Sequence, residues 1–334
     1  MCGICGYYSE EIDEDLVKSM CNVLQHRGPD DSGTFVDKNI GLGMRRLSVI
    51  DLKGGHQPIH NEDQSIWIIF NGEIYNFIEL REELERKGHK FYTNTDTEVI
   101  VHSYEEYGRD CVKSLNGDFA FAIWDKNKKL LFLARDRLGI KPLYYFYDKK
   151  KFIFGSEIKA IITDKSVPRE IDEKALHCYM GYEYIPSPLT IFKRIEKLKP
   201  AHTLIYKDEK IFIEKYWDIS GDIVNLHKGY YQENIHKLLK DSVKKRLVSD
   251  VSLGAFLSGG IDSSYIVALM AKLMKEPVKT FSIGFHDQSY NELEYAGKVA
   301  KIFNTDHYEK ILKPNITELM EKVAYYYDEP FADA

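Results

Sequence analysis

Short apolar runs joined by polar turns characterise the chain from its start to about residue 215. Such runs flank a few turn residues at two places, which are residues 119–135 (FAFAIW and LLFLAR) and residues 142–156 (PLYYFY and KFIFGS). This pattern predicts β-hairpins of antiparallel sheet. A third run, residues 65–70 (SIWIIF), leads into Asn71-Gly72, a dipeptide that is typical of a turn.

Helical periodicity interrupts these runs. Residues 77–89 place Phe77, Leu80 and Leu84 on one face and contain Gly88 as a stop signal. Sheets with helices packed on their outer faces form a layered α+β domain. The first half is therefore predicted to have this architecture.

The pattern of apolar and polar residues changes after residue 220. Apolar runs that predict strands now alternate with amphipathic stretches that predict helices. The strands are expected at residues 252–257, 278–285 and 307–312, and the helices at 232–248, 264–274, 292–303 and 316–327. This alternation predicts a parallel α/β sheet with right-handed crossovers. Residues 187–220 are expected to connect the two halves.

Composition narrows the class of protein. A chain of 334 residues predicts about two domains, which we expect at residues 2–215 and 225–334. The net charge of −6 gives no reason to expect nucleic acid or an acidic membrane as partner. No run approaches about 18 apolar residues, and no secretory signal is recognisable. Together with five scattered cysteines, these features favour a reducing cytoplasm.

Two cysteines stand close to the N-terminus. Cys2 and Cys5 have the spacing of half a zinc site, but no second pair follows at metal spacing, which disfavours zinc. Removal of Met1 would give Cys2 a free α-amine with a pKa of about 8. That amine can accept the thiol proton, so that one residue supplies nucleophile and base. The alternative is a cysteine that simply begins a buried strand.

The loop of residues 258–263 (SGGIDS) lies between a predicted strand and a predicted helix. Open α/β sheets bind ligands at the carboxyl ends of their strands. Here Gly259 and Gly260 let backbone N–H groups approach an anion, and Ser258 and Ser263 add hydroxyl donors. Asp262 would repel a bare phosphate, which indicates an intervening Mg²⁺. No Gly-Lys-Ser/Thr ends the loop, so it is not a Walker loop.

Residues 257–264 (LSGGIDSS) resemble the pyrophosphate loop of ATP pyrophosphatases, which split ATP between its α- and β-phosphates. The first half resembles class II glutamine amidotransferases, which are N-terminal-nucleophile hydrolases. Together the two halves are similar to the glutamine-hydrolysing asparagine synthetase family. The motifs that carry the resemblance of the first half are CGI (2–4), HRGPD (26–30), RRLSVID (45–51), NGEIYN (71–76), TDTEV (95–99), LNGDFAFAIWD (115–125) and RDRLGIKPLYY (135–145).

This resemblance implies a glutaminase site in the first half. Cys2 would attack the glutamine amide, and the resulting oxyanion needs two preorganised donors, which Asn71 and Gly72 can supply. The resemblance favours Arg46 over Arg45 as the residue that binds the substrate α-carboxylate. The remaining contacts to glutamine are expected from the carboxylates of Glu73 and Asp96, for the α-ammonium, and from the backbone of Val49 and Ile50. His26 and Arg27 are given no catalytic role.

For the second half the resemblance implies ATP as cosubstrate, with Mg²⁺. Aspartate would become β-aspartyl-AMP, pyrophosphate would leave into the loop of residues 258–263, and ammonia would reach the adenylate through a tunnel. Leu257 and Ile283 are expected to contact the adenine nucleotide. In the family the synthetase domain continues well beyond a position equivalent to residue 334, so a C-terminal portion is expected to be missing. A homodimer is an expectation from the family alone.

Several alternatives stay open or are disfavoured. Amidotransferases that act on sugar phosphates or phosphoribosyl compounds lack an SGGIDS loop, and β-lactam synthetase lacks the nucleophile. An asparagine-synthetase-like enzyme that amidates another carboxylate is not excluded, because the acceptor pocket is expected beyond residue 334. A glutaminase-only fragment, a glutamine- or nucleotide-sensing subunit and an inactive remnant also remain. Intact nucleophile, oxyanion and carboxylate-binding residues argue against decay of the first half.

Overall fold

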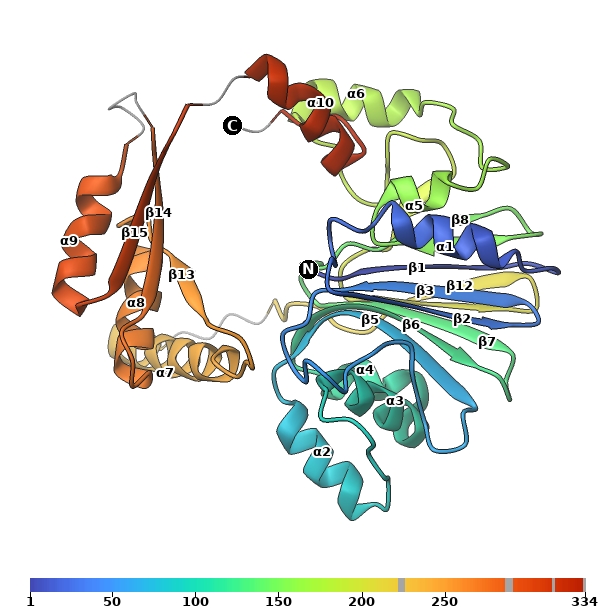
Figure 1. Ribbon diagram of the computed structural model, residues 1–334, viewed down its shortest axis with the longest axis horizontal. Coiled ribbons are helices and arrows are strands. Elements are labelled where there is room, and N and C mark those ends of the chain that lie inside the picture. The colour runs from blue at the N-terminus through green and yellow to red at the C-terminus, as the bar shows by residue number, and fades with distance from the viewer. Residues whose placement is uncertain (222–225, 286–290, 314–315, 333–334) are drawn as a thin grey trace. The chain divides into compact units, whose positions relative to one another are not determined.

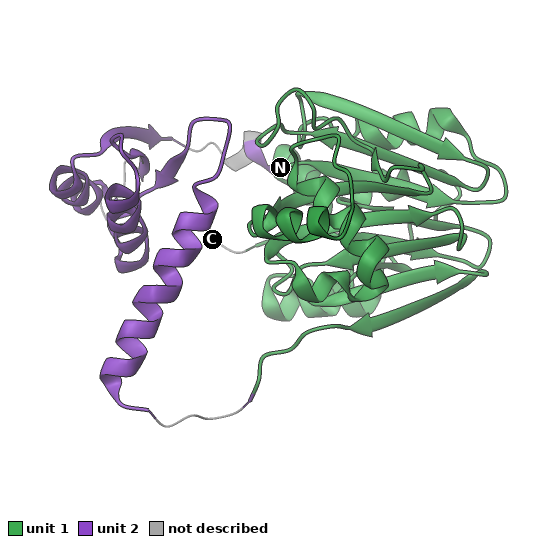
Figure 2. Cartoon of the chain, turned by 90° about the horizontal axis from the view of Figure 1, so that it is seen from below, with its two compact units in different colours: residues 1–220, 321–334 green, residues 221–320 purple. Residues whose placement is uncertain are grey.

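The computed structural model divides the chain into two compact units, which are residues 1–220 with 321–334, and residues 221–320 (Figures 1 and 2). It describes residues 1–221, 226–285, 291–313 and 316–332. The domain limits of 2–215 and 225–334 stay predictions, and residues 225 and 334 lie outside the described residues. No helix of the described chain is long and apolar enough to cross a membrane.

Two antiparallel sheets form the centre of the first unit. The first has the order β10-β8-β9-β1-β3-β2 and the second the order β12-β11-β7-β6-β5-β4. The strands of the first sheet are β1 (Gly3–Tyr8), β2 (Asp31–Asp37), β3 (Ile40–Arg46), β8 (Tyr144–Tyr147), β9 (Phe152–Gly155) and β10 (Ile195–Lys197). Those of the second are β4 (Ile59–His60), β5 (Ile66–Ile74), β6 (Gly117–Asp125), β7 (Leu130–Arg135), β11 (His202–Lys207) and β12 (Lys210–Lys215).

Strand alternation explains why these sheets stack. Successive side chains of a strand point to opposite faces. In β6, Phe119 and Phe121 enter the core under the helices of the second sheet, whereas Ala120 and Ala122 enter the core between the sheets. Helices α1 (Glu14–Asn22) and α5 (Ile158–Ile162) cover the first sheet, and α2 (Phe77–Arg86), α3 (Asp96–Tyr107) and α4 (Cys111–Ser114) cover the second (Figure 1). The predicted layered α+β fold of an N-terminal-nucleophile hydrolase is confirmed.

Two local predictions for this unit are wrong. The hairpins at 119–135 and 142–156 exist, but Asn71-Gly72 forms no turn. Strand β5 continues through both residues, which pair with Ala120 and Phe119 of β6. A long pairing partner therefore overrides the turn propensity of the dipeptide. Residues 187–220 are not a simple connection either, because they contain β10, β11 and β12 of the two sheets.

The second unit contains a parallel sheet of the order β13-β14-β15. Its strands are β13 (Gly254–Phe256), β14 (Lys279–Phe285) and β15 (Asp306–Leu312), and its helices are α7 (Lys228–Arg246), α8 (Ile261–Leu273) and α9 (Leu293–Phe303). Helix α8 begins inside the predicted loop. Helix α7 begins earlier than expected, because His227 Nδ1 caps it by accepting a hydrogen bond from the Tyr230 N–H. The predicted partial α/β fold is confirmed.

One face of this parallel sheet is covered and the other is not. Thr280 and Ser282 of β14 point into the buried side, where Val267 of α8 and Ala296 of α9 pack. The alternate residues of β14, which are Phe281, Ile283 and Phe285, point to the opposite face of the sheet and remain partly exposed. Parallel sheets are generally covered on both faces. Within the described residues of this unit, the second covering layer is absent.

Helix α10 (Ile316–Tyr327) and the residues after it return to the first unit. Tyr325 and Tyr326 contact the ring of His26 edge-on. Asp328 Oδ1 lies 3.0 Å from Lys159 Nζ, and the Ala332 N–H donates to the Glu183 carbonyl. These contacts fix residues 325–332 within the first unit.

Candidate active site

Cys2 lies immediately before β1, against the backbone of the segment that follows β3. Its Sγ accepts a hydrogen bond of 3.4 Å from the Leu47 N–H and lies 3.6 Å from the Leu47 carbonyl oxygen. Burial raises the pKa of the Cys2 thiol, and the charge of Asp96 adds to this increase, while that of Arg46 opposes it. A thiol in such surroundings needs a nearby base to become a thiolate.

Met1 precedes Cys2 in the sequence, and its removal would determine whether that base exists. With Met1 present, the Cys2 nitrogen belongs to a peptide bond and cannot accept a proton. The Met1 side is open to solvent, since 58% of this residue is exposed. Burial lowers the pKa of the α-amine of Met1. After removal of Met1, an amine at Cys2 would stand next to its own thiol.

Arg27 is a residue of this site to which the sequence analysis gave no role. Its Nε donates a hydrogen bond of 2.8 Å to the Cys2 carbonyl oxygen, and its Nη1 donates one of 2.9 Å to Glu157 Oε1. Glu157 also bonds Lys159, whose ammonium pairs with Asp328. Burial alone would raise the pKa of Glu157, but hydrogen bonds from Arg27 and Lys159 lower it. The signal in the sequence was the motif HRGPD, which contains Arg27.

Asn71 has an unusual environment for a buried amide. Only 1% of the residue is exposed, and among the described residues neither Nδ2 nor Oδ1 has a hydrogen-bond partner. A buried polar group without a partner costs about 1–3 kcal/mol. At Gly72, an added Cβ would come within 2.2 Å of the Asp118 carbonyl oxygen. The glycine therefore allows the close pairing of β5 with β6 that keeps Asn71 in place.

Arg46 lies at the end of β3 and is 6% exposed. Its Nη2 donates to the carbonyl oxygens of Ile50 and Asp51, at 2.8 and 2.9 Å. The loop that contains Val49 is thereby tied to the guanidinium. Arg45 points elsewhere, because its Nε donates to the Gly28 carbonyl. The preference for Arg46 over Arg45 is consistent with this arrangement, and its role stays a prediction.

Two carboxylates complete the predicted glutamine site. Asp96 is the first residue of α3, and its Oδ2 accepts a hydrogen bond of 2.8 Å from the Ile74 N–H, next to Glu73. Burial raises the pKa of Asp96 to about 6. Burial and the neighbouring charge of Asp96 raise the pKa of Glu73 to about 7. Two buried carboxylates, one of which disfavours ionisation of the other, form an environment that a substrate ammonium would stabilise.

The loop of residues 258–263 is held by its own serines. Ser258 Oγ and Ser263 Oγ lie 3.0 Å apart, and Ser258 Oγ accepts a hydrogen bond from the Gly260 N–H. Gly259 has a φ of +83°, and a Cβ there would come within 2.5 Å of Tyr295 Cβ. Gly260 is the residue that precedes α8, so the loop ends at a helix N-terminus, which favours anions.

A cavity of about 250 Å³ opens beside this loop, between the ends of β13 and β14 and helix α9. Leu257, Ser258, Ser263 and Ile283 all contribute to its lining. Asp262 is exposed on the first turn of α8 and is not among the lining residues. One exposed carboxylate with phosphate oxygens is a donor set that Mg²⁺ accepts, so the residues fit this ion. The nucleotide and magnesium contacts stay predictions.

Comparisons with known proteins agree with both halves. A family model described as a glutamine amidotransferase domain matches residues 1–217, and one described as asparagine synthase matches residues 234–334. Glutamine-hydrolysing asparagine synthetase 1 of Bacillus subtilis is 40% identical over all of this chain, which spans 54% of that protein. A provisionally assigned glutamine-hydrolysing asparagine synthetase of Methanocaldococcus jannaschii is 41% identical, with 69% of its length covered.

Among solved structures, the allosteric regulatory enzyme of purine biosynthesis aligns with 94% of this chain and 81% of its own. The TM-score is 0.51 at 16% sequence identity, a likeness of fold alone. The chain spans about half the length of the Bacillus relative that it matches. The amidotransferase match, the asparagine synthase match and the full-chain identity agree on one conclusion: this chain belongs to the glutamine-hydrolysing asparagine synthetase family.

Proposed function

We propose that the first unit hydrolyses glutamine to glutamate and ammonia, with Cys2 as the nucleophile. The unsatisfied side-chain amide of Asn71 carries this proposal most directly. Buried polar groups normally have partners, and one without a partner marks a site where a ligand supplies it. An oxyanion that forms next to Cys2 would be such a partner for Nδ2.

The chemistry follows from the residues around Cys2. The α-amine accepts the thiol proton, and the thiolate attacks the amide carbon of glutamine. Asn71 Nδ2 and the Gly72 N–H stabilise the oxyanion, and its collapse expels ammonia, which takes the proton from the α-ammonium. Water then hydrolyses the thioester, releasing glutamate and restoring the thiol. Arg27 holds the Cys2 carbonyl in place and so positions the nucleophile.

Recognition of glutamine is assigned to the charged groups around this centre. Arg46 binds the α-carboxylate, and Asp96 and Glu73 bind the α-ammonium. Arg46 already uses Nη2 for the carbonyl oxygens of Ile50 and Asp51, which leaves its other nitrogens for a substrate. Val49 and Ile50 then contact the substrate through the loop that Arg46 holds.

For the whole protein we propose glutamine-dependent asparagine synthesis. Aspartate would be adenylated by ATP, with Mg²⁺ at Asp262, and pyrophosphate would leave into the loop of residues 258–263. Leu257 and Ile283 would contact the nucleotide from the cavity beside this loop. The uncovered face of β14 is consistent with a domain whose second layer lies outside the described residues. An acceptor carboxylate other than aspartate and a glutaminase-only activity are the competing functions.

A product profile tests these functions together. The protein is incubated with glutamine, Mg-ATP and aspartate, and glutamate, AMP, pyrophosphate and asparagine are quantified. Equal yields of glutamate, AMP and asparagine support the synthetase, and glutamate without AMP supports glutaminase activity alone. Cys2→Ala should abolish glutamate formation and keep glutamine binding, and turnover by this variant would exclude Cys2 as nucleophile. Asp262→Asn should weaken Mg-ATP use and leave the glutaminase unchanged.

A further inference from the structure

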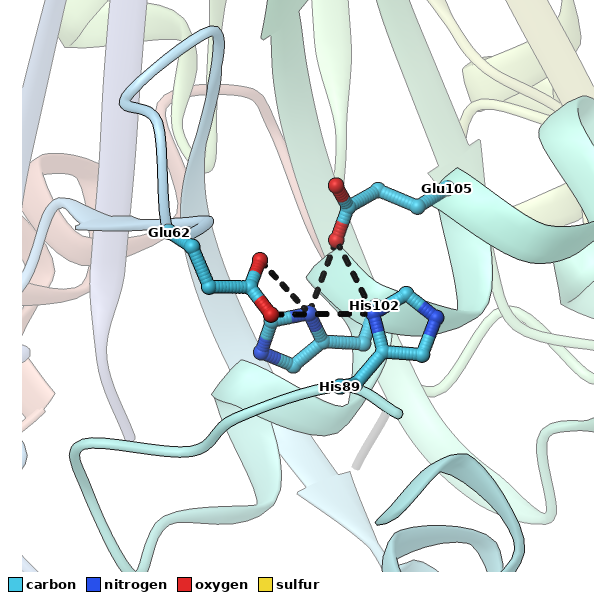
Figure 3. Close-up of side chains that lie close together, drawn as sticks. All are labelled: Glu62, His89, His102 and Glu105. Atoms are coloured by element: carbon cyan, nitrogen blue, oxygen red, sulfur yellow. Dashed lines mark hydrogen bonds and ion pairs between the residues drawn. The ribbon is translucent and has the colours of Figure 1, made fainter. Parts of the chain in front are cut away.

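Four metal-ligating side chains converge on one point of the first unit, away from the Cys2 site. Glu62 comes from the turn between β4 and β5, His89 from the segment between α2 and α3, and His102 and Glu105 from α3 (Figure 3). One ligand atom from each lies within 4.8 Å of the other three. We refer to these four residues as the His/Glu cluster.

The distances inside the cluster suit a small tetrahedral ion. Glu105 Oε2 lies 3.5 Å from His89 Nδ1 and 2.8 Å from His102 Nδ1. Glu62 oxygens lie 3.9 Å from His89 Nδ1 and 3.7 Å from His102 Nδ1. Zinc binds nitrogen and oxygen at about 2.0–2.2 Å, so tetrahedral ligand atoms are separated by about 3.3–3.6 Å. The four ligand atoms lie within 4.8 Å of one another and would shift relative to one another to bind such an ion.

The two histidines differ in how they present Nδ1. His102 Nδ1 forms a hydrogen bond of 2.8 Å with Glu105 Oε2, while its Nε2, 3.5 Å from Glu98 Oε1, has no hydrogen-bond partner among the described residues, so a metal at Nδ1 would replace the proton of that hydrogen bond. His89 Nε2 lies 3.1 Å from Glu106 Oε1, and this carboxylate holds the proton at Nε2 and leaves the lone pair of His89 Nδ1 free. This carboxylate–histidine arrangement accompanies most metal-bound histidines. Glu105 is oriented as well, because its Oε1 accepts a hydrogen bond of 2.8 Å from Asn61 Nδ2.

The charge around the cluster is strongly negative. Glu62, Glu98, Glu105 and Glu106 all face the two imidazoles. Lys87 pairs with one of these carboxylates, since its Nζ lies 3.0 Å from Glu106 Oε2. His102 and Glu98 are fully buried, while Glu62 is 39% exposed at the open side. A divalent cation entering past Glu62 would offset the repulsion among these carboxylates.

We propose that Glu62, His89, His102 and Glu105 bind one divalent transition-metal ion of the Zn²⁺ class as a structural site. The ion would join three segments that are distant in sequence. One of them is α3, whose first residue is Asp96 of the proposed glutamine site. The metal therefore fixes the helix that presents a substrate-binding carboxylate, about 9 Å along its axis from the cluster.

Zinc binding is measured on the full chain after treatment with a chelator. The Cys2→Ala background is used, so that the nucleophile thiol cannot bind the metal. Calorimetry with Zn²⁺ should give one site per chain with a dissociation constant at or below about 1 μM, and saturation should raise Tm. Co²⁺ should produce the visible absorption of a tetrahedral site with nitrogen and oxygen ligands. Absence of stoichiometric Zn²⁺ binding overturns the proposal, and the cluster is then a hydrogen-bonded network only.

Variants separate this site from other zinc ligands. H89Q and E62Q change residues at the accessible side and should weaken Zn²⁺ binding at least about 100-fold. H177Q changes an exposed histidine of α6 (Glu173–Tyr182) and should keep wild-type affinity. The substitution E106Q removes the carboxylate that pairs with His89 Nε2 and with Lys87 Nζ but leaves all four proposed ligands in place, and we expect it to weaken binding about 10-fold. Equal affinities of H89Q and H177Q would contradict the assignment.

Discussion

Arg27 Nε donates a hydrogen bond to the Cys2 carbonyl oxygen, at 2.8 Å, and this contact is the end of a longer series of charged groups. Glu157 accepts from Arg27, Lys159 donates to Glu157, and Asp328 pairs with Lys159. Asp328 lies in the part of the chain that matches the asparagine synthase model. The backbone of Cys2, the proposed nucleophile, is thus linked through alternating charges to a residue in the part of the chain that matches the asparagine synthase model.

The first prediction concerns Glu157. Replacing it by Gln removes the negative charge that orients Arg27, and the Cys2 carbonyl loses its fixed position. We expect kcat of the glutaminase to fall about 10–100-fold, because a small displacement of the nucleophile is costly. The KM for glutamine should change little, since Glu157 lies outside the proposed substrate contacts. Steady-state glutamate release gives both constants.

Two further variants define the cause. Asp328→Asn should lower kcat by a smaller factor, because Lys159 and Glu157 remain. Glu170→Gln is the control, as Glu170 forms an exposed ion pair with Lys193 at 3.5 Å. Unchanged kcat in Glu157→Gln would show that the Cys2 carbonyl needs no charged support.

The second prediction concerns Asn71, whose amide has no partner among the described residues. Asn71→Leu keeps the approximate shape and removes the polar atoms. The free energy of unfolding should rise by about 1–3 kcal/mol, while kcat falls about 10²–10³-fold through loss of an oxyanion donor. Thermal unfolding and glutamate release measure the two effects.

Asn61 offers the matched control for that substitution. It is equally buried, but its amide bonds Ser65, Glu105 and the Ile66 N–H. Asn61→Leu should therefore destabilise the protein. If Asn71→Leu also destabilises it, then Asn71 has a partner in solution and its proposed readiness for the oxyanion is wrong.

The sequence predicted the fold better than its local details. The continuous apolar run of residues 119–124 predicted β6 correctly, and the run is apolar throughout because its two faces enter two different cores. Asn71-Gly72 wrongly predicted a turn, since the turn propensity of two residues is weaker than pairing with a nine-residue strand. Residues 187–220 wrongly predicted a simple connection for a related reason, as short strands have weak signals until their neighbours are known.

The candidate site shows the same division. Cys2, Arg46, Asn71 and Asp96 could be identified because each lies in a motif of the family. The hydrogen bonds of Arg27 to Cys2 and Glu157 could not be predicted, because these partners are far from Arg27 in the sequence. The His/Glu cluster was invisible for the same reason: its four residues come from three segments without a metal-binding spacing. Such contacts are set by tertiary packing and not by local pattern.

The third prediction is a pH dependence of glutamine binding. The pKa of Glu73 is raised to about 7 and that of Asp96 to about 6, in both cases chiefly by burial. Both must be ionised to bind the substrate ammonium, so the KM for glutamine should rise as pH falls through 7 and then 6. Glu73→Gln should remove the step near 7 and leave the one near 6. A KM that stays constant between about pH 8 and about pH 5.5 would contradict both assignments.

The stability of the substrate-free protein should fall as pH rises, whereas the binding of glutamine should become stronger. The pKa of Glu73 in the folded protein, about 7, exceeds its ordinary value of 4.5, so the folded state binds this proton more tightly. The free energy of unfolding of the substrate-free protein should therefore fall as pH rises from about 4.5 to about 7. Glu73→Gln should flatten this slope in chemical denaturation at several pH values.

The fourth prediction concerns Met1. An N-terminal extension leaves the Cys2 nitrogen in a peptide bond, so the extended protein should release glutamate at least about 10²-fold more slowly. Proteolytic removal that leaves Cys2 first should restore the rate. Intact mass identifies the N-terminus of each preparation. Full activity with Met1 retained would show that another group accepts the thiol proton.

The fifth prediction uses the two glycines of the SGGIDS loop as a matched pair. Gly259 has a φ of +83°, and a Cβ there would lie 2.5 Å from Tyr295 Cβ, whereas the nearest atom to a Cβ on Gly260 is Ser258 Oγ at 3.3 Å. Gly259→Ala should cost about 1–3 kcal/mol of stability and abolish binding of inorganic pyrophosphate with Mg²⁺. Gly260→Ala should cost about 0.5–1 kcal/mol and retain binding. Calorimetric titration with pyrophosphate compares the two variants. Equal loss of binding in both would mean that the loop tolerates no side chain at either position. The backbone conformation of Gly259 alone would then not determine anion binding.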